Sequence, residues 1–171
     1  MKIFLPLALA LTAAGCGYHV AGQAALMPKN IQTIAIPAFR NVTTGRAKLS
    51  RLITAEVSRE FISRTHYTIV TQPEQADAVL VGTLSSFNGF PIISDPASGR
   101  ATGIQVVATL QITLTDRHTG KTLFSRVNYE FRERYEVSLD PQAYFDESGT
   151  AIERLSRDVA RSVVTAILEN F

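Results

Sequence analysis

The chain has 171 residues, of which 46% are hydrophobic and 19% are charged, a composition typical of one globular domain with a hydrophobic core. The formal net charge is +2, and it falls to +1 when the first 15 residues, whose only charged residue is Lys2, are left out. A balance so close to neutral excludes a general basic field for binding nucleic acid, so any anion site must be a local cluster.

The first residues have the pattern of an export signal. Lys2 precedes an apolar run from Ile3 to Ala14, which is too short to span a bilayer, because a spanning helix needs about 20 residues. Small residues then lead to Cys16, the only cysteine, as in lipid-modified exported proteins. We therefore expect residues 1–15 to be a signal peptide and Cys16 to carry lipid. The alternative is an ordinary secretory signal followed by an incidental cysteine.

Residues 16–30 are expected to form a lipidated N-terminus and a linker, since they contain Gly17, Gly22 and Pro28. Two or more acyl chains would anchor Cys16 stably in a membrane. Gly17 stands where an Asp would signal retention in the inner membrane, so we expect the outer membrane as the location.

Residues 31–171 are predicted to form a single α+β domain with the element order β-α-β-β-β-β-α. Short strands are expected at 31–36, 67–71 and 78–87, and an amphipathic helix at 47–64. The apolar face of that helix contains Leu49, Leu52, Ile53, Val57 and Phe61. Alternating residues predict a long strand at 102–115, a hairpin loop at 116–120 and a returning strand at 121–135. The core side of the returning strand is expected to contain Leu123, Val127, Tyr129 and Phe131.

A second helix closes the predicted domain. Thr150 and Glu153 fit a capping box at its start. Its apolar stripe contains Ile152, Leu155, Val159, Val163 and Ile167. We expect a two-layer sandwich in which both helices pack on one face of a small mixed sheet of four to five strands. The other face of the sheet would then be open, either as a solvated surface or as a contact surface.

One predicted connection between strands is unusually apolar. Residues 87–93, Phe-Asn-Gly-Phe-Pro-Ile-Ile, follow the strand at 78–87, whereas loops are usually polar and lie on the surface. Phe90, Ile92 and Ile93 would either fold over the edge of the core or dock on another protein. These three residues are therefore candidates for partner contact.

A second candidate site is basic. If the two long strands pair around the loop at 116–120, Arg134 lies opposite Thr102 and Arg132 lies opposite Ile104. Arg100 comes just beyond that end, so we expect the three arginines to gather there. The cluster is either a solvated rim of mixed charge or an anion site, since Arg pairs well with phosphate.

No sequence motif predicts an enzyme. The chain has no G-x-S-x-G, P-loop or H-E-x-x-H motif. His19, His66 and His118 lack the spacing of metal ligands, and His118 is expected to be solvated in the hairpin loop. Asp and Glu near turns often cap backbone groups. We therefore predict no catalytic residue, no metal and no cofactor.

Several segments match one known family in order and spacing. They are Cys16-Gly17-Tyr18-His19-Val20, "IAIPAFRN" at 34–41, "ADAVLVGTL" at 76–84, "TGKTLFS" at 119–125 and "SRDVA" at 156–160. Together with the export signal they span nearly all of the chain, which resembles the LptE family of lipopolysaccharide-assembly lipoproteins.

The resemblance implies a function without catalysis. Members of the family plug the lumen of the LptD β-barrel in the outer membrane, help that barrel to assemble, bind lipopolysaccharide and assist its passage to the cell surface. The implied partners are an LptD-type barrel, lipopolysaccharide and, through the lipid anchor, the outer membrane. Functional basic residues of the family lie near the tip between the middle strands, and the nearest match is Arg100. Lipopolysaccharide is thus the implied ligand of Arg100, Arg132 and Arg134.

A second resemblance leaves an alternative open. The segment "IAIPAFRN" also resembles the first strand of CsgG-like secretion lipoproteins and of peptidoglycan-synthase activators, which are an oligomeric pore and an enzyme regulator. The long amphipathic β-hairpin of a pore is missing. A co-purifying barrel would favour the first resemblance, and self-assembled rings would favour the second.

Overall fold

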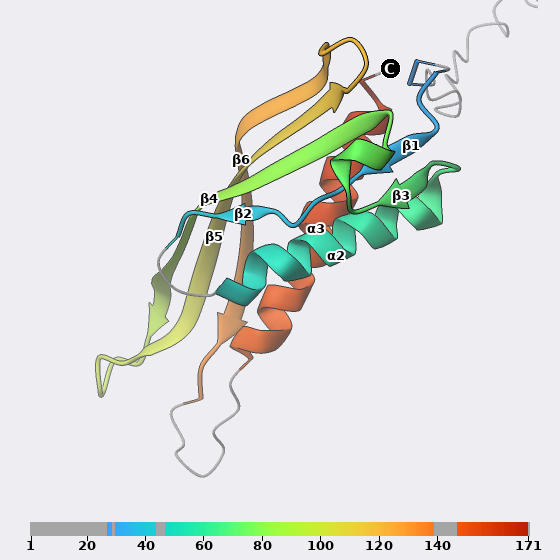
Figure 1. The fold of residues 1–171 in the computed structure, drawn as a ribbon. Helices are drawn as coiled ribbons and strands as arrows, with labels where there is room; N and C mark the ends of the chain where they lie inside the picture. The colour runs from blue at the N-terminus through green and yellow to red at the C-terminus, as the bar shows by residue number, and fades with distance from the viewer. Residues whose placement is uncertain (1–26, 29, 44–46, 139–146, 171) are drawn as a thin grey trace, which may run out of the picture.

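The computed structural model describes residues 27–28, 30–43, 47–138 and 147–170. Its strands are β1 (Thr33–Ala35), β2 (Arg40–Asn41), β3 (Thr68–Val70), β4 (Ala78–Ser94), β5 (Ala101–Asp116) and β6 (Thr122–Glu136). Its helices are α2 (Ala47–Arg64), α3 (Ser148–Leu168) and the short 3-10 turn η2 (Pro73–Gln75). The predicted α+β class and element order are confirmed, with β2 as an additional short strand (Figure 1).

The strands form one mixed, six-stranded sheet in the order β3-β1-β4-β5-β6, with β2 beside β4. β1 pairs in parallel with both β3 and β4, and β2 also runs parallel to β4. β4, β5 and β6 form an antiparallel meander. The sheet is therefore slightly larger than the predicted four to five strands, because the chain returns to β4 after Pro37 instead of leaving the sheet.

Both helices pack on the same face of the sheet, as Figure 1 shows. Leu49, Ile53, Val57 and Phe61 of α2 and Leu155, Val159, Val163 and Ile167 of α3 are all 0–1% exposed. They meet Leu80, Leu110 and Ile112 of the sheet in one core. Burying each such side chain contributes about 1.5–3 kcal/mol, so this shared face is the main source of stability.

The buried core differs from the predicted one at two residues in the N-terminal part of the domain. Leu52 was expected on the apolar face of α2, but it is 38% exposed, because it lies at the margin of that face. Met27 falls in the expected linker, yet it is 3% exposed and belongs to the core. In the described residues, packing therefore begins before β1.

A β-bulge in β6 overturns another core prediction. Leu110 pairs with Tyr129 but Ile112 pairs with Arg126, so β6 has one extra residue here. Asn128 takes the left-handed conformation at φ 53° and completes the bulge. Val127 is consequently 60% exposed and does not join the core side.

The predicted start of the last helix is also wrong. α3 begins at Ser148, and Glu147 at its N-cap makes no side-chain capping hydrogen bond. Thr150 and Glu153 thus lie inside the helix and form no capping box. Ser148 and Ala151 are buried, so tertiary packing extends the helix beyond the local capping signal.

Candidate functional site

The apolar segment 87–93 is a strand, which corrects the loop prediction. It forms the second half of β4 and pairs with β5, from Phe87 opposite Ala108 to Pro91 opposite Ile104. Aromatic and β-branched residues favour a strand. A proline is tolerated in an edge strand where its position has no neighbouring strand to accept a backbone hydrogen bond. The β4–β5 hairpin therefore extends to the lower left of Figure 1, past the ends of both helices.

Phe90, Ile92 and Ile93 are exposed on this extension. Their exposed fractions are 51%, 42% and 57%, so none of the three folds over the edge of the core. A Cβ atom at Gly103 would lie 3.1 Å from atoms of Ile93, which shows that Ile93 rests across that glycine. All three side chains are therefore exposed apolar groups near the hairpin tip.

The tip of the hairpin is a closed turn at residues 95–100. The N–H of Gly99 donates to Asp95 O and the N–H of Asp95 donates to Arg100 O, both at 2.8 Å. Asp95 Oδ2 accepts from Ser98 Oγ at 2.5 Å and from the Ser98 N–H at 2.8 Å, and these bonds lower the pKa of Asp95. Gly99 has φ 68°, which favours glycine. Arg100 is exposed at the end of this ordered turn.

Arg132 and Arg134 are not beside Arg100, contrary to the predicted pairing. Arg134 lies opposite Gln105 and Arg132 opposite Val107, so the register is shifted by three residues from the prediction. A loop that is longer by one residue and two irregularities in β6 cause the shift. Arg134 is five positions from Arg100 along the hairpin, roughly 16 Å at the usual rise of a strand.

The two β6 arginines have local partners. Arg132 forms an ion pair with Glu130 at 2.5 Å. Arg134 Nε donates to Gln105 Oε1 at 3.1 Å. Both contacts lie on the sheet face opposite the helices, which is also the face of Phe90, because Phe90 pairs with Gln105. The structure thus separates the predicted cluster into Arg100 at the tip and an Arg132–Arg134 pair on β6.

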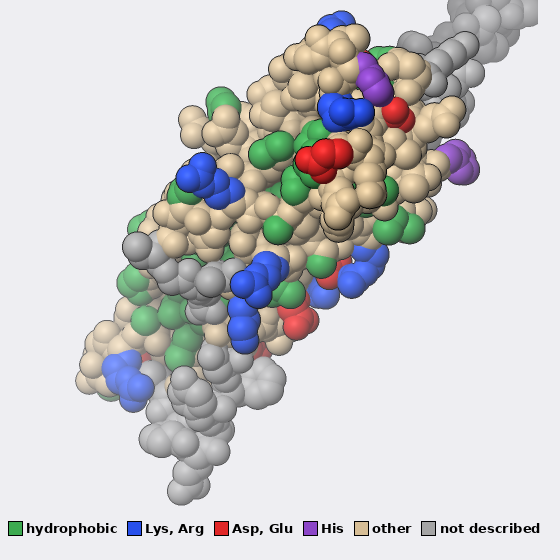
Figure 2. Space-filling model, in the orientation of Figure 1, with side chains coloured by type: hydrophobic (Ala, Val, Ile, Leu, Met, Phe, Trp, Pro, Cys, Tyr) green, Lys and Arg blue, Asp and Glu red, His purple; other side chains and the backbone are tan. Residues whose placement is uncertain are grey.

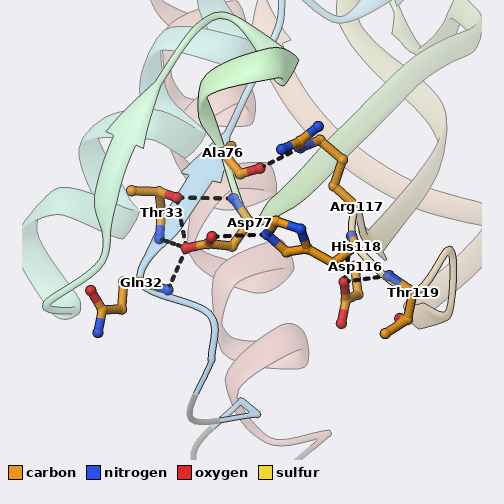
Figure 3. A network of polar contacts seen from close by, with 8 residues as sticks. All are labelled: Gln32, Thr33, Ala76, Asp77, Asp116, Arg117, His118 and Thr119. Carbon is orange, nitrogen blue, oxygen red and sulfur yellow. Dashed lines mark hydrogen bonds and ion pairs between the residues drawn. The ribbon is translucent and has the colours of Figure 1, made fainter.

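A polar network at the other end of the sheet surrounds Asp77, the residue before β4 (Figure 3). Asp77 Oδ2 accepts hydrogen bonds from the N–H groups of Gln32 and Thr33, both at 2.9 Å, and from Thr33 Oγ1 at 2.8 Å. Asp77 Oδ1 lies 3.2 Å from His118 Nε2. The hydrogen bond from Gln32, followed by those from Thr33, lowers the pKa of Asp77 well below its usual range.

The same network fixes the loop between β5 and β6. The Arg117 N–H donates to Asp77 O at 2.8 Å, and Arg117 Nε donates to Ala76 O at 2.7 Å. Asp116 Oδ1 accepts from the N–H groups of His118 and Thr119, which is the turn-capping role expected of such a residue. The His118 side chain is 53% exposed, so it is both solvated and in contact with Asp77.

Sequence reasoning missed Asp77. Its partners Thr33 and His118 are 44 and 41 positions away, so no local motif marks them. The network joins strand ends and a turn by hydrogen bonds.

Among the described residues, no group of three or more His, Cys, Asp or Glu side chains is placed to hold a metal ion. Neither described helix combines the length and the apolar character needed to cross a membrane. Cys16 and the expected signal peptide lie outside the described residues.

Solved structures with low sequence identity share the fold. Lipoprotein B from Nitrosomonas europaea has 16% identity and a TM-score of 0.56, and the match covers 90% of this chain and 88% of that one. Rare lipoprotein B from Shewanella oneidensis has 14% identity and a TM-score of 0.50, covering 79% and 92%. A PelC dodecamer from Paraburkholderia phytofirmans has 11% identity and a TM-score of 0.50, covering 80% and 89%. This is therefore an α+β domain of a fold that occurs in bacterial lipoproteins.

The sequence narrows this class to a family. The family model of LptE, described as lipopolysaccharide-assembly, matches residues 31–167. The chain belongs to this family, which confirms the resemblance inferred from the sequence motifs. A search of curated proteins finds no match.

Proposed function

We propose that this protein is an outer-membrane lipoprotein that plugs an LptD-type β-barrel, helps it to assemble and assists lipopolysaccharide transport to the cell surface. The observation that carries the proposal is the family match over residues 31–167. In this role the protein is a scaffold and not an enzyme, and it needs no cofactor.

Each candidate site has a part in this function. Lipid on Cys16 holds the protein to the outer membrane, with the domain facing the periplasm or within the barrel lumen. Phe90, Ile92 and Ile93 contact the barrel, and their exposure on a strand that extends past the helices supports this role. Arg100 meets phosphate groups of lipopolysaccharide at the hairpin tip, and Arg132 and Arg134 form a second contact on β6.

Affinity purification from native membranes tests the proposal. The tagged, full-length protein is extracted in mild detergent, and its partners are identified by mass spectrometry. We expect a stoichiometric β-barrel of the LptD type, together with lipopolysaccharide. Recovery of the protein alone, or as a self-assembled ring, would contradict the proposal and favour a secretion component or a synthase activator.

A further inference from the structure

A cavity of about 400 Å³ lies between β6 and the C-terminal end of α3. This volume is within the usual range of small-molecule sites, about 300–1,000 Å³. The polar part of its lining consists of Arg126, Tyr129, Ser162, Thr165, Glu169 and Asn170. None of these residues belongs to the hairpin tip or to the polar network of Figure 3, so the cavity is a separate feature of the domain.

The bulge in β6 brings two of the lining side chains to the same side of the sheet. Residues three apart in a regular strand point to opposite faces. Here Arg126 pairs with Ile112 and Tyr129 pairs with Leu110, and both β5 residues are 0% exposed in the core. Arg126 and Tyr129 therefore both lie on the side of the helices. Bulges often re-aim a side chain towards a site in this way.

Arg126 is held in place by an aromatic ring and not by a counter-ion. Its guanidinium carbon lies 4.8 Å from the centroid of the Tyr129 ring, which is a cation–π contact. The Tyr129 hydroxyl donates in turn to Ser162 O of α3 at 3.4 Å. Among the described residues, no carboxylate forms an ion pair with Arg126. A guanidinium that stacks on a ring can still donate its N–H groups to an anion.

Glu169 supplies a negative charge where α3 is already negative. It is the C-cap residue of α3. The C-terminal end of a helix carries partial negative charge, which favours a cation there. The last turn of α3 has no basic residue, and Glu169 forms no ion pair within the described part of the chain. This end of the cavity therefore attracts a cation.

Opposite charges elsewhere on the domain lie together. Blue and red side chains follow α2 in Figure 2, and Arg59 pairs there with Glu56 at 2.6 Å. Arg154 of α3 pairs with Glu133 at 3.0 Å. By contrast, the two charged residues that line the cavity do not pair with each other, although they have opposite signs. A ligand with one negative and one positive group would satisfy both.

The cavity lies at the end of the domain where the described chain begins. The first described residues, the loop between β5 and β6 and the last turn of α3 are together at the upper end of Figure 1. Asn170 Nδ2 donates to Leu123 O at 3.0 Å, which joins the end of α3 to the start of β6. A side-chain hydrogen bond from Asn30 to Asp116 joins the first residues to the same loop.

This position is the one nearest to the expected lipid anchor. The 11 steps of the chain from Cys16 to Met27 span at most about 40 Å, at about 3.6 Å per residue. The 17 residues of β4 alone extend over about 55 Å towards the hairpin tip. Lipid on Cys16 would therefore hold the cavity end of the domain closer to the membrane surface than the tip.

We propose that the cavity binds the phosphoethanolamine headgroup of a phospholipid in the membrane that holds Cys16. Arg126 donates hydrogen bonds to the phosphate, while Glu169 and the C-terminal end of α3 receive the ammonium group. A phosphodiester carries one negative charge, so this headgroup matches the two opposite charges of the lining. The hydroxyl groups of Ser162 and Thr165 offer further hydrogen bonds. The inference rests on the proposed function, because the lipid anchor supplies the membrane.

Two other kinds of ligand fit less well. A ligand with only negative charge is repelled by Glu169 and leaves the end of α3 without a cation. A free amino acid carries both charges, but it is not concentrated near the cavity. A membrane headgroup is, because the anchor makes its binding effectively intramolecular.

Titration with soluble headgroups tests the site. The full-length protein is purified in a detergent without phosphate or amine groups. Glycerophosphoethanolamine, glycerophosphoglycerol and glycine are then titrated separately by calorimetry. The variants Arg126→Gln and Glu169→Gln each remove one charge from the cavity. Arg157→Gln and Glu153→Gln are the matched controls, since they remove the same charges from exposed positions of α3 outside the cavity.

We expect the wild type to bind glycerophosphoethanolamine at least about fivefold more tightly than the other two ligands. Each cavity variant should weaken this binding at least about fivefold, as expected for one charged contact in an open site, and the controls should not. Circular dichroism confirms the fold, and if a variant fails to fold, the ranking of the three ligands by the wild type still decides. Equal or tighter binding of glycerophosphoglycerol or glycine, or no saturable binding of glycerophosphoethanolamine, would overturn the inference.

Lipid that co-purifies from native membranes identifies the source of the headgroup. Mass spectrometry should find more ethanolamine phospholipid per protein in the wild type than in Arg126→Gln. Equal amounts would overturn the assignment to a membrane lipid. If fatty-acid labelling shows no lipid on Cys16 while glycerophosphoethanolamine still binds, the proposed function fails and the headgroup site is supported.

Discussion

Replacement of Asp77 by Ala should destabilise the domain by about 3 kcal/mol. The variant loses three hydrogen bonds accepted by Oδ2, two of them from the backbone N–H groups of Gln32 and Thr33. Each bond to the carboxylate contributes about 1 kcal/mol net here, below the range of about 1.5–3 kcal/mol for hydrogen bonds to charged groups, because the side chain of Asp77 is 26% exposed. The end of the sheet where β1, β4 and the β5–β6 loop meet would be weakened first.

Thermal and urea unfolding, followed by circular dichroism, measure this effect. For a domain of this size, 3 kcal/mol corresponds to a lowering of the melting temperature by about 6–12 °C. Asp95→Ala is the control, since it also removes two short hydrogen bonds but only from a local turn at the hairpin tip. A melting temperature of Asp77→Ala within about 2 °C of the wild type would refute the reasoning.

The Asp77 contribution has a defined pH dependence. Because folding lowers the pKa of Asp77, its stabilising effect is complete above the unfolded pKa of about 3.9 and is lost as the pH falls towards the folded value. The stability difference between the wild type and Asp77→Ala should be constant between about pH 5 and 7 and should shrink below about pH 4. A difference that grew towards acid pH would contradict the assigned hydrogen bonds.

Four further predictions concern other parts of the chain. Cys16→Ala should abolish fatty-acid labelling and membrane retention, and a wild type without acyl chains would exclude the lipoprotein assignment. A photo-crosslinker at Phe90 should capture a barrel protein in cells, because this side chain is 51% exposed, whereas capture of the chain itself alone would indicate no partner there. Arg100→Asp and Arg134→Asp should each weaken the binding of purified lipopolysaccharide, and the two losses should be nearly additive because the two residues are far apart. Both losses should be smaller at high salt, and unchanged affinity of the folded double variant would exclude both sites. Gly82→Ala should destabilise by about 1–3 kcal/mol, since the added Cβ would lie 2.3 Å from the Phe39 ring, and unchanged unfolding would contradict this tight packing.

Regular periodicity in the sequence predicted the fold well. The helix expected at 47–64 coincides with α2, and the alternation at 102–115 falls within β5. Both elements bury one face, so their apolar residues recur at the period of the element. The family resemblance likewise followed from segments that keep their order along the chain.

Local irregularities account for most of the errors. Bulges at Ser85 and near Ile92 interrupt the alternation of apolar and polar residues in β4. Because Gly89 and Pro91 are also typical of loops, the sequence predicted a loop where the structure has a strand. The bulge at Asn128 is one of the irregularities that shifted β6 and separated Arg134 from Arg100. The position of such a bulge depends on how two strands pair, so it cannot be predicted from the sequence of either strand alone.

The Asp77 network could not be predicted from the sequence for a different reason. Asp77 follows a short 3-10 turn and precedes a strand, where an Asp is unremarkable in sequence. Its importance comes from Thr33 and His118, which only the folded sheet brings to it. The sequence predicted that one face of the sheet would be open, but the residues on that face follow only from the pairing of β4 with β5.

Depletion of the protein in its own bacterium tests the central claim most directly, with newly made, labelled lipopolysaccharide measured at the cell surface. If the protein assists transport through an outer-membrane barrel, depletion should lower surface lipopolysaccharide and leave the labelled material inside the envelope, and wild-type protein should restore its arrival. Unchanged surface lipopolysaccharide after complete depletion would contradict the account.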